Sequence, residues 1–245
     1  MFKACVFKTS ENNSHRKKIL HLTLFIILIF ACPPNLYAGK IIEQPALECY
    51  LGIPKSSPST SSKPMPVLVV LPGWGVMAKS DINLWAFPAD KRGFLLIELN
   101  VNYSGVSTTQ LYSRIQNIIG SLLESYHIDK GKMFIAGTSA GGMMAMALAL
   151  SHPREFKAVG VVSGARFSFG AEKFLKNAAG QLFYLYHGRN DKTISIGEFY
   201  YTKSQLEEQG AVIESKVIPE GGHTLPSSCY KEVVDRFYQI SELIP

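Results

Sequence analysis

The sequence is poor in the residues and spacings that bind metal ions. Its 245 residues include only four cysteines and six histidines, and none of these forms a Cys-x-x-Cys or His-x-x-x-His pair. Metal sites commonly use such spacings because several ligands must converge on one ion. We therefore expect no metal site and no cofactor.

The chain also has little net charge beyond its first residues. The formal charge of +6 is concentrated in residues 1–38, which hold five of the 25 Lys and Arg residues but only one of the 19 Asp and Glu residues. The remainder has 20 basic and 18 acidic residues. Nucleic-acid binding requires a basic surface, so we expect no nucleic-acid partner.

The apolar stretch near the N-terminus, 19–31, is shorter than the roughly 20 residues that a membrane span needs. Three consecutive basic residues precede it, and Ala38 then supplies a small residue before Gly39. This order is typical of a secretory signal peptide. We predict that residues 1–38 are a leader and that the protein is secreted or periplasmic.

The sequence leaves two other fates open for this leader. It could stay uncleaved as an N-terminal anchor, because Leu36 is larger than the residue preferred three positions before the cut. It could also be lipidated at Cys32, since Leu28 to Cys32 resembles a bacterial lipobox, in which Phe30 fits poorly. Membrane contact would then occur only through the leader, and the protein would be a membrane-anchored lipoprotein.

Residues 39–245 have the length of one domain and no internal repeat. Runs rich in Val, Ile and Leu alternate with stretches of helical spacing, which predicts one mostly parallel sheet with helices on both faces. The expected strands are 41–53 (a strand or hairpin), 67–71, 94–101, 133–136, 158–163, 182–186 and 212–218. The expected helices are 109–126, 142–150, 171–178, 198–209 and 228–240, with a short connecting segment around Trp85 and Phe87.

Two cysteines, Cys49 and Cys229, remain after the predicted leader. An even pair in an oxidising compartment can form a disulfide, and we expect one between the early strand region and the start of the last helix. The sequence cannot show that the two residues approach each other. Two buried thiols are therefore the alternative.

One pentapeptide, Gly137-Thr138-Ser139-Ala140-Gly141, lies between an expected buried strand and an expected helix. A sharp, glycine-flanked turn between strand and helix is the setting of a serine nucleophile. The turn holds the serine backbone in a sparsely populated conformation and thereby places the hydroxyl group at the end of the sheet. The N-terminus of the following helix favours a developing negative charge. We predict that Ser139 is a nucleophile.

Two further polar residues, Asp191 and His223, each follow an expected strand. Ligands gather beyond the carboxyl ends of parallel strands, so both residues should lie near the serine. An imidazole can take the proton of a serine hydroxyl, and a carboxylate orients the imidazole. We predict a triad of Ser139, Asp191 and His223. Glu220 and Asp129 are rival acids that are less well placed.

An oxyanion needs two hydrogen-bond donors. The backbone N–H of Ala140, directly after the serine, should be one of them. The other should come from the loop after 67–71, where Gly73 and Gly75 allow a close approach to the substrate. Trp74 N–H is the predicted second donor.

These motifs together resemble the α/β-hydrolase superfamily, in particular its small serine esterases of the dienelactone-hydrolase, carboxylesterase and polyester-depolymerase type. The resemblance runs from residue 67 to the C-terminus and rests on Gly-Thr-Ser-Ala-Gly-Gly at 137–142, His-Gly-Arg-Asn-Asp at 187–191 and Gly-His at 222–223. Leu-Pro-Gly-Trp-Gly at 71–75 stands where many members have His-Gly-x-Gly. The resemblance implies an α/β-hydrolase fold, with a single catalytic domain over 39–245.

The motifs predict an exported serine hydrolase that cleaves carboxylic esters of a small molecule or a polymer through an acyl-enzyme on Ser139. A serine peptidase or an acyltransferase could use the same three residues. A non-catalytic binding protein on a hydrolase fold is a further alternative, since fold does not determine function. The complete set of three residue types argues against it.

Segment 165–180 is short at the place where many members of this superfamily insert a large lid. We therefore expect an open site with no large lid, suited to short acyl esters. Trp74, Phe167 and Phe169 could contact an apolar or aromatic group, and Arg166 could meet an acidic substituent. All four could equally be packing or surface residues.

Overall fold

The computed structural model describes residues 39–55 and 63–244, and all of them belong to one structural unit. The predicted leader, with its alternative of lipidation at Cys32, lies outside these residues and stays a prediction. Among the described residues, no helix is both long enough and apolar enough to cross a membrane.

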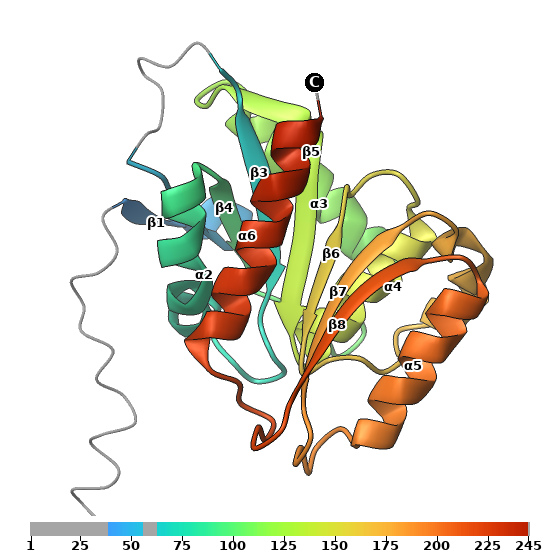
Figure 1. The fold of residues 1–245 in the computed structure, drawn as a ribbon. Helices are drawn as coiled ribbons and strands as arrows, with labels where there is room; N and C mark the ends of the chain where they lie inside the picture. Colours follow the sequence, from blue (N-terminus) through green and yellow to red (C-terminus); the bar gives the residue numbers. More distant parts are fainter. Residues whose placement is uncertain (1–38, 56–62, 245) are drawn as a thin grey trace, which may run out of the picture. The chain divides into compact units, whose positions relative to one another are not determined.

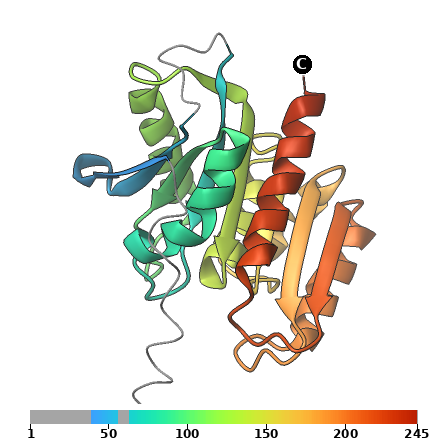
Figure 2. The same cartoon turned by 60° about the vertical axis from the view of Figure 1, so that its left-hand side comes forward.

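Eight strands form one sheet in the order β1-β2-β4-β3-β5-β6-β7-β8. The strands are β1 (Lys40–Gln44), β2 (Cys49–Ile53), β3 (Met65–Leu71), β4 (Leu95–Leu99), β5 (Ile128–Thr138), β6 (Val159–Val162), β7 (Leu182–Gly188) and β8 (Val212–Ile218). The β1–β2 hairpin is antiparallel and joins β4 in antiparallel pairing, whereas all pairings from β4 to β8 are parallel. Figure 2 shows the blue hairpin at one edge and the orange β7 and β8 at the other. The mostly parallel sheet predicted from the sequence is confirmed.

Helices cover both faces of the sheet. They are α2 (Ala78–Arg92), α3 (Thr108–Leu122), α4 (Ala140–Ser151), α5 (Ile196–Glu208) and α6 (Ser227–Leu243), with two 3-10 helices, η1 (Pro45–Leu47) and η2 (Ala171–Ala178). α2 and α6 pack together on one face, in front in Figure 1, and the other face carries α3, α4 and α5. This arrangement agrees with the predicted two-sided covering.

The sheet separates two hydrophobic clusters. Alternate residues of β3 point to opposite sides, so that Val69 packs in the cluster under α3 and α4, and Val70 packs in the cluster under α2 and α6. Both residues are fully buried. Burial on both faces explains why this strand is a continuous apolar run without the alternation of a half-exposed strand.

α2 is the helix that the sequence analysis did not anticipate. The segment around Trp85 and Phe87, expected to be a short connection, is a 15-residue helix. Pro88 lies inside it and lacks a backbone donor, and Met77 offers no side-chain cap, so two usual signs of a helix are missing. Tertiary packing compensates, because Trp85 is fully buried and meets the ring of Tyr230 edge to face in α6.

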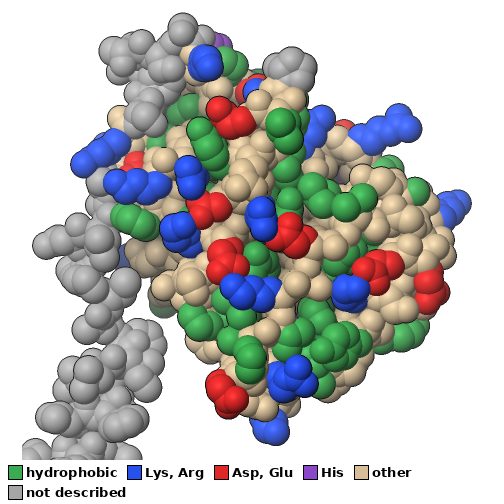
Figure 3. Space-filling model, in the orientation of Figure 1, with side chains coloured by type: hydrophobic (Ala, Val, Ile, Leu, Met, Phe, Trp, Pro, Cys, Tyr) green, Lys and Arg blue, Asp and Glu red, His purple; other side chains and the backbone are tan. Residues whose placement is uncertain are grey.

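The parallel strands place the predicted site at one end of the sheet, where β3, β5, β7 and β8 all finish. This end lies at the bottom of Figure 1. On the face seen in Figure 3, acidic and basic side chains are interspersed, and hydrophobic side chains are visible toward the same lower edge. The loops after these strands can therefore converge on one small region.

The prediction of a disulfide is wrong. Cys49 and Cys229 are both free and buried. Cys49 belongs to the cluster under α3 and α4, and Cys229 belongs to the cluster under α2 and α6. The sheet separates these two clusters, so the sulfur atoms face opposite sides and the two residues form the pair of buried thiols that was the alternative.

Buried thiols should react slowly. Burial raises the pKa of Cys49 to about 11 and also raises the pKa of Cys229, and only the thiolate is a good nucleophile. We expect a protein consisting of residues 39–245 to show almost no reaction with a disulfide reagent at pH 8 while folded. Two thiols should titrate after unfolding without a reductant, and none would be found if a bridge were present.

Candidate active site

Ser139 lies in the tight turn between β5 and α4. Its backbone has φ 54° and ψ −120°, a combination that is costly for a residue with a side chain. The Ser139 N–H donates to the carbonyl of Val162 at 2.9 Å, which ties the turn to the end of β6. The strained serine that the sequence predicts at this turn is therefore present.

The glycines around this turn are required because backbone packs directly on backbone. A Cβ atom on Gly137 would overlap with the Gly141 carbonyl group, and a Cβ atom on Gly141 would overlap with the carbonyl oxygen of Leu71 in β3. The start of α4 can approach both β5 and β3 only when side chains are absent here. The close approach holds the serine at the end of the sheet.

Two loops bring a histidine and an aspartate to this serine. The hydroxyl of Ser139 lies 2.9 Å from Nε2 of His223, and Nδ1 of His223 lies 2.7 Å from Oδ2 of Asp191. Because a carboxylate only accepts hydrogen bonds, Nδ1 is the donor, and Nε2 is left to accept from the serine hydroxyl. The structure thus brings together all three residues of the predicted triad, which come from the ends of β5, β7 and β8.

Asp191 is buried but well provided with hydrogen bonds. Its other oxygen, Oδ1, accepts from the backbone N–H of Thr193 at 2.7 Å and of Ile194 at 3.0 Å. Burial by itself would raise the pKa of Asp191, but the hydrogen bonds from His223 and from these two N–H groups outweigh burial and hold the pKa below its ordinary value. The carboxylate is therefore charged and oriented toward the imidazole.

The rival acids do not take this place. Glu220 is exposed on the loop that carries the histidine, and Asp129, near the start of β5, bonds the N–H of Gly131. His187 is a hydrogen-bonded residue at the end of its strand, since its buried Nε2 lies 3.0 Å from the carbonyl oxygen of Ile194. Burial lowers its pKa, and the neutral ring donates to that carbonyl.

The two predicted oxyanion donors are both available. The Gly73 carbonyl accepts from Val76 N–H at 3.1 Å, and Gly75 has φ 72°, so residues 73–76 form a β-turn that contains Trp74. Among the hydrogen bonds of the described residues, none uses the N–H of Trp74 or of Ala140. Gly73 also lies next to the Cβ of Ser139. These donors fit the predicted role, which stays a prediction.

The predicted substrate contacts have partners within the protein. Arg166 forms an exposed ion pair with Glu198 of α5 at 3.1 Å, so an acidic substituent would have to compete with a carboxylate already present. The Phe167 ring meets Tyr201 edge to face. Segment 165–180 contains only η2 as a regular element, and the described chain has no large lid.

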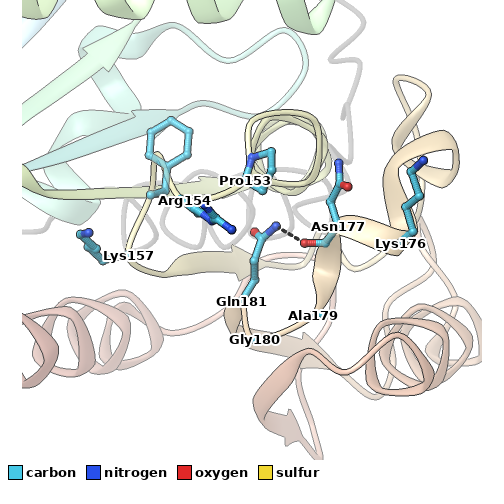
Figure 4. A pocket seen from close by; sticks show the side chains of 9 residues that line it. Pro153, Arg154, Lys157, Lys176, Asn177, Ala179, Gly180 and Gln181 are labelled. Atoms are coloured by element: carbon cyan, nitrogen blue, oxygen red, sulfur yellow. Dashed lines mark hydrogen bonds between the residues drawn. The ribbon is translucent and has the colours of Figure 1, made fainter.

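A separate pocket of about 560 Å³ lies at the opposite end of the sheet. Figure 4 shows its lining residues, which follow α4 and precede β7. Within it, Asn177 donates to the Leu150 carbonyl at 2.8 Å, and Gln181 donates to the carbonyls of Ala149 and Asn177. The Asn177 and Gln181 amides thereby satisfy the Leu150 and Ala149 carbonyl groups near the end of α4, so these two lining residues have a structural role.

Among residues 39–55 and 63–244, no group of His, Cys, Asp and Glu side chains is arranged to hold a metal ion. The site that the structure does assemble is made of a serine, a histidine and an aspartate.

Comparison with known proteins agrees with this geometry. The sequence profile of the phospholipase/carboxylesterase family matches residues 98–241, which is more than half of the chain. The chain belongs to the phospholipase/carboxylesterase family. The matched region includes the serine turn and the loops that carry Asp191 and His223. Membership supports a hydrolase of the serine esterase kind.

Solved structures of other α/β-hydrolases share the fold at low sequence identity. Est1E from Butyrivibrio proteoclasticus is 14% identical, with a TM-score of 0.59 over 84% of this chain and 98% of its own. TT1662 from Thermus thermophilus is 16% identical, with a TM-score of 0.62 over the same shares. FphF, a fluorophosphonate-binding serine hydrolase from Staphylococcus aureus, is 15% identical, with a TM-score of 0.61 over 82% of this chain and 96% of its own. No curated protein sequence matches the chain.

The structure also contains a contact next to the site that the sequence did not predict. The hydroxyl of Tyr103 donates to the carbonyl oxygen of Pro72 at 2.6 Å. The two residues are 31 positions apart, and the tyrosine lies in an irregular segment after β4, so no periodic pattern identifies it. Only the aromatic residue itself, placed soon after a strand that ends near the site, could have drawn attention to it.

The close packing of the serine turn can be tested with two glycine substitutions. Gly141→Ala should lower the free energy of unfolding by about 1–3 kcal/mol, because the added methyl group has no room. Gly120→Ala is the matched control, since Gly120 is an exposed position of α3 with no atom within 4 Å of an added Cβ. It should raise stability by about 0.5–1 kcal/mol. Urea unfolding measures both, and similar effects of the two changes would contradict the packing argument.

Proposed function

We propose that the protein is an exported serine hydrolase that cleaves carboxylic esters through an acyl-enzyme on Ser139. The observation that carries this proposal is the continuous hydrogen-bond chain from Ser139 through His223 to Asp191, which starts at a serine with a strained backbone. This is the arrangement that lets a weak nucleophile attack an ester carbonyl.

In the first half of the reaction, Ser139 Oγ attacks the carbonyl carbon while its proton moves to Nε2 of His223. The carbonyl oxygen becomes an oxyanion and accepts from the N–H groups of Trp74 and Ala140. The charge of Asp191 stabilises the imidazolium that has formed. Collapse of this intermediate breaks the bond to the alcohol oxygen, which takes the proton from His223 and leaves.

In the second half, water replaces the alcohol. His223 Nε2 takes one proton of the water as its oxygen attacks the acyl carbon, and the same two donors hold the second oxyanion. Collapse releases the carboxylic acid, and the proton returns to Ser139 Oγ. The net reaction consumes one ester and one water and yields one acid and one alcohol.

Removing the serine hydroxyl tests the mechanism directly. Ser139→Ala should abolish ester hydrolysis and labelling by a fluorophosphonate probe while the thermal unfolding midpoint changes little. Asp191→Asn should lower kcat/KM by about 10²- to 10⁴-fold, because the carboxylate orients and stabilises the imidazole without bonding to the substrate.

The matched control for the acid is Glu220→Gln, which removes the charge of the exposed rival on the histidine loop. It should leave kcat/KM nearly unchanged. Greater damage from this change than from Asp191→Asn would show that the acid has been misidentified. An unaltered rate in Ser139→Ala would remove the whole mechanism, whereas a wild-type protein without any hydrolysis would favour a non-catalytic binding protein.

We further propose that the site is open and prefers short acyl groups. Each extra methylene gains about 0.8 kcal/mol only while there is protein surface to bury it, and segment 165–180 is too short to cover a long chain. Across a series of p-nitrophenyl esters, kcat/KM should peak at about two to six carbons. A preference for sixteen-carbon esters with activation at a lipid–water interface would contradict this proposal.

Export is the remaining part of the proposed function. If residues 1–38 are a cleaved leader, the intact mass of the exported protein should correspond to a chain that begins at Gly39. A mass that includes diacylglycerol on Cys32 would show a lipoprotein instead, and the mass of the full 245-residue chain would show a retained anchor.

A further inference from the structure

The loop between β3 and α2, residues 72–77, carries the proposed oxyanion donor Trp74 on an exposed segment. The side chains of Trp74 and Met77 are 61% and 68% exposed, so packing of these side chains does little to fix the loop. An oxyanion hole works only when its donors are oriented before the charge develops. Other residues must therefore hold this backbone in place.

The first end of the loop is held by Tyr103. Its hydroxyl donates to the Pro72 carbonyl oxygen at 2.6 Å, and its side chain is buried. The ring stacks on that of Trp74 at 5.9 Å and contacts Phe169 at 5.6 Å. The Pro72 carbonyl belongs to the same rigid peptide plane as the Gly73 N–H, so this one hydrogen bond sets the orientation in which the 73–76 turn begins.

The second end of the loop leads into α2, and two buried acids lie in α2 and in β4. Asp81, in the first turn of α2, donates its backbone N–H to the Met77 carbonyl at 3.2 Å and accepts from Trp85 Nε1 at 3.3 Å. Glu98 is fully buried in the middle of β4, with Val70 of β3 and Tyr50 of β2 as its neighbours across the sheet.

Neither of these two acids has a basic partner. Among the ion pairs of the described residues, none includes Asp81 or Glu98, and neither carboxyl oxygen of Glu98 has a hydrogen-bond partner there. Burial first, and then the neighbouring charge of Asp81, raise the pKa of Glu98 well above its ordinary value. Glu98 therefore stays neutral at ordinary pH.

The other titratable groups around this pair are tyrosines. Asp81 and Glu98 add to burial in raising the pKa of Tyr103, and Asp81 contributes to the raised pKa of Tyr230 in α6. Tyr50 of β2 lies opposite Glu98. These hydroxyl groups remain neutral at ordinary pH, so none of them supplies a positive charge that would favour ionisation of Glu98.

We propose that Tyr103 is a positioning residue that clamps the first end of loop 72–77 and so aims the Trp74 N–H at the oxyanion. This inference rests on the proposed function. Tyr103 does not touch the reacting atoms and acts through the backbone that carries the donor.

Tyr103→Phe removes only the hydroxyl and keeps the aromatic stack. We expect kcat for a short p-nitrophenyl ester to fall about 10-fold with KM nearly unchanged, short of the roughly 10²- to 10³-fold loss that follows removal of a whole donor. The inhibition constant of a trifluoromethyl ketone, whose serine adduct carries an oxyanion, should rise by the same factor as kcat/KM falls.

Tyr112→Phe is the matched control. Tyr112 is a half-buried tyrosine of α3 whose ring is stacked on that of His152. Its kcat and its trifluoromethyl ketone inhibition constant should stay within about 2-fold of the wild-type values. The proposal is overturned if Tyr103→Phe changes these two quantities no more than Tyr112→Phe does.

The outcome also separates this inference from the proposed function. A wild-type protein without esterase activity or fluorophosphonate labelling would mean that the proposed function itself has failed. An active wild-type protein with a fully active Tyr103→Phe variant would mean that only the clamp is wrong.

Discussion

Direct packing of backbone on backbone at the end of β5 is the constraint on which the rest of the site depends. Where Gly141 meets the Leu71 carbonyl, the N-terminus of α4 approaches β3 more closely than any side chain would allow. That approach holds Ser139 in its strained conformation and brings its neighbour Ala140 close to the loop after β3. The positions of the nucleophile and of both proposed oxyanion donors therefore depend on the absence of side chains at this turn.

Burial and hydrogen bonds determine which acidic side chains in and near the site are charged. Asp191 is buried without a Lys or Arg partner among the described residues, and the N–H groups of Thr193 and Ile194 together with His223 keep it ionised. Glu98 in β4 is the opposite case, because burial raises its pKa well above the ordinary value. One acid is held charged by hydrogen bonds and orients an imidazole, and another is kept neutral by burial.

The way each element packs against the sheet explains which features could be predicted from the sequence and which could not. Strands such as β3 are apolar throughout because both faces are covered, and their sequence alone predicted them. α2 was missed because its stability comes from tertiary contacts, chiefly the burial of Trp85 against α6, and its own sequence contains Pro88 and lacks a capping residue. The cysteines were paired wrongly because an even count says nothing about which side of a sheet each sulfur faces.

The sequence by itself determined the mostly parallel fold, the glycine-flanked turn around Ser139 and the choice of Asp191 and His223. These features can be predicted locally, because the spacing of apolar residues identifies each strand and the polar residue that follows it. Parallel strands then bring their carboxyl ends to one edge of the sheet. The tertiary structure alone decided that Tyr103 bonds Pro72, that Arg166 is paired with Glu198 and that the thiols lie apart. These contacts join residues distant in the chain, and each depends on how loops and helices pack after the sheet has formed.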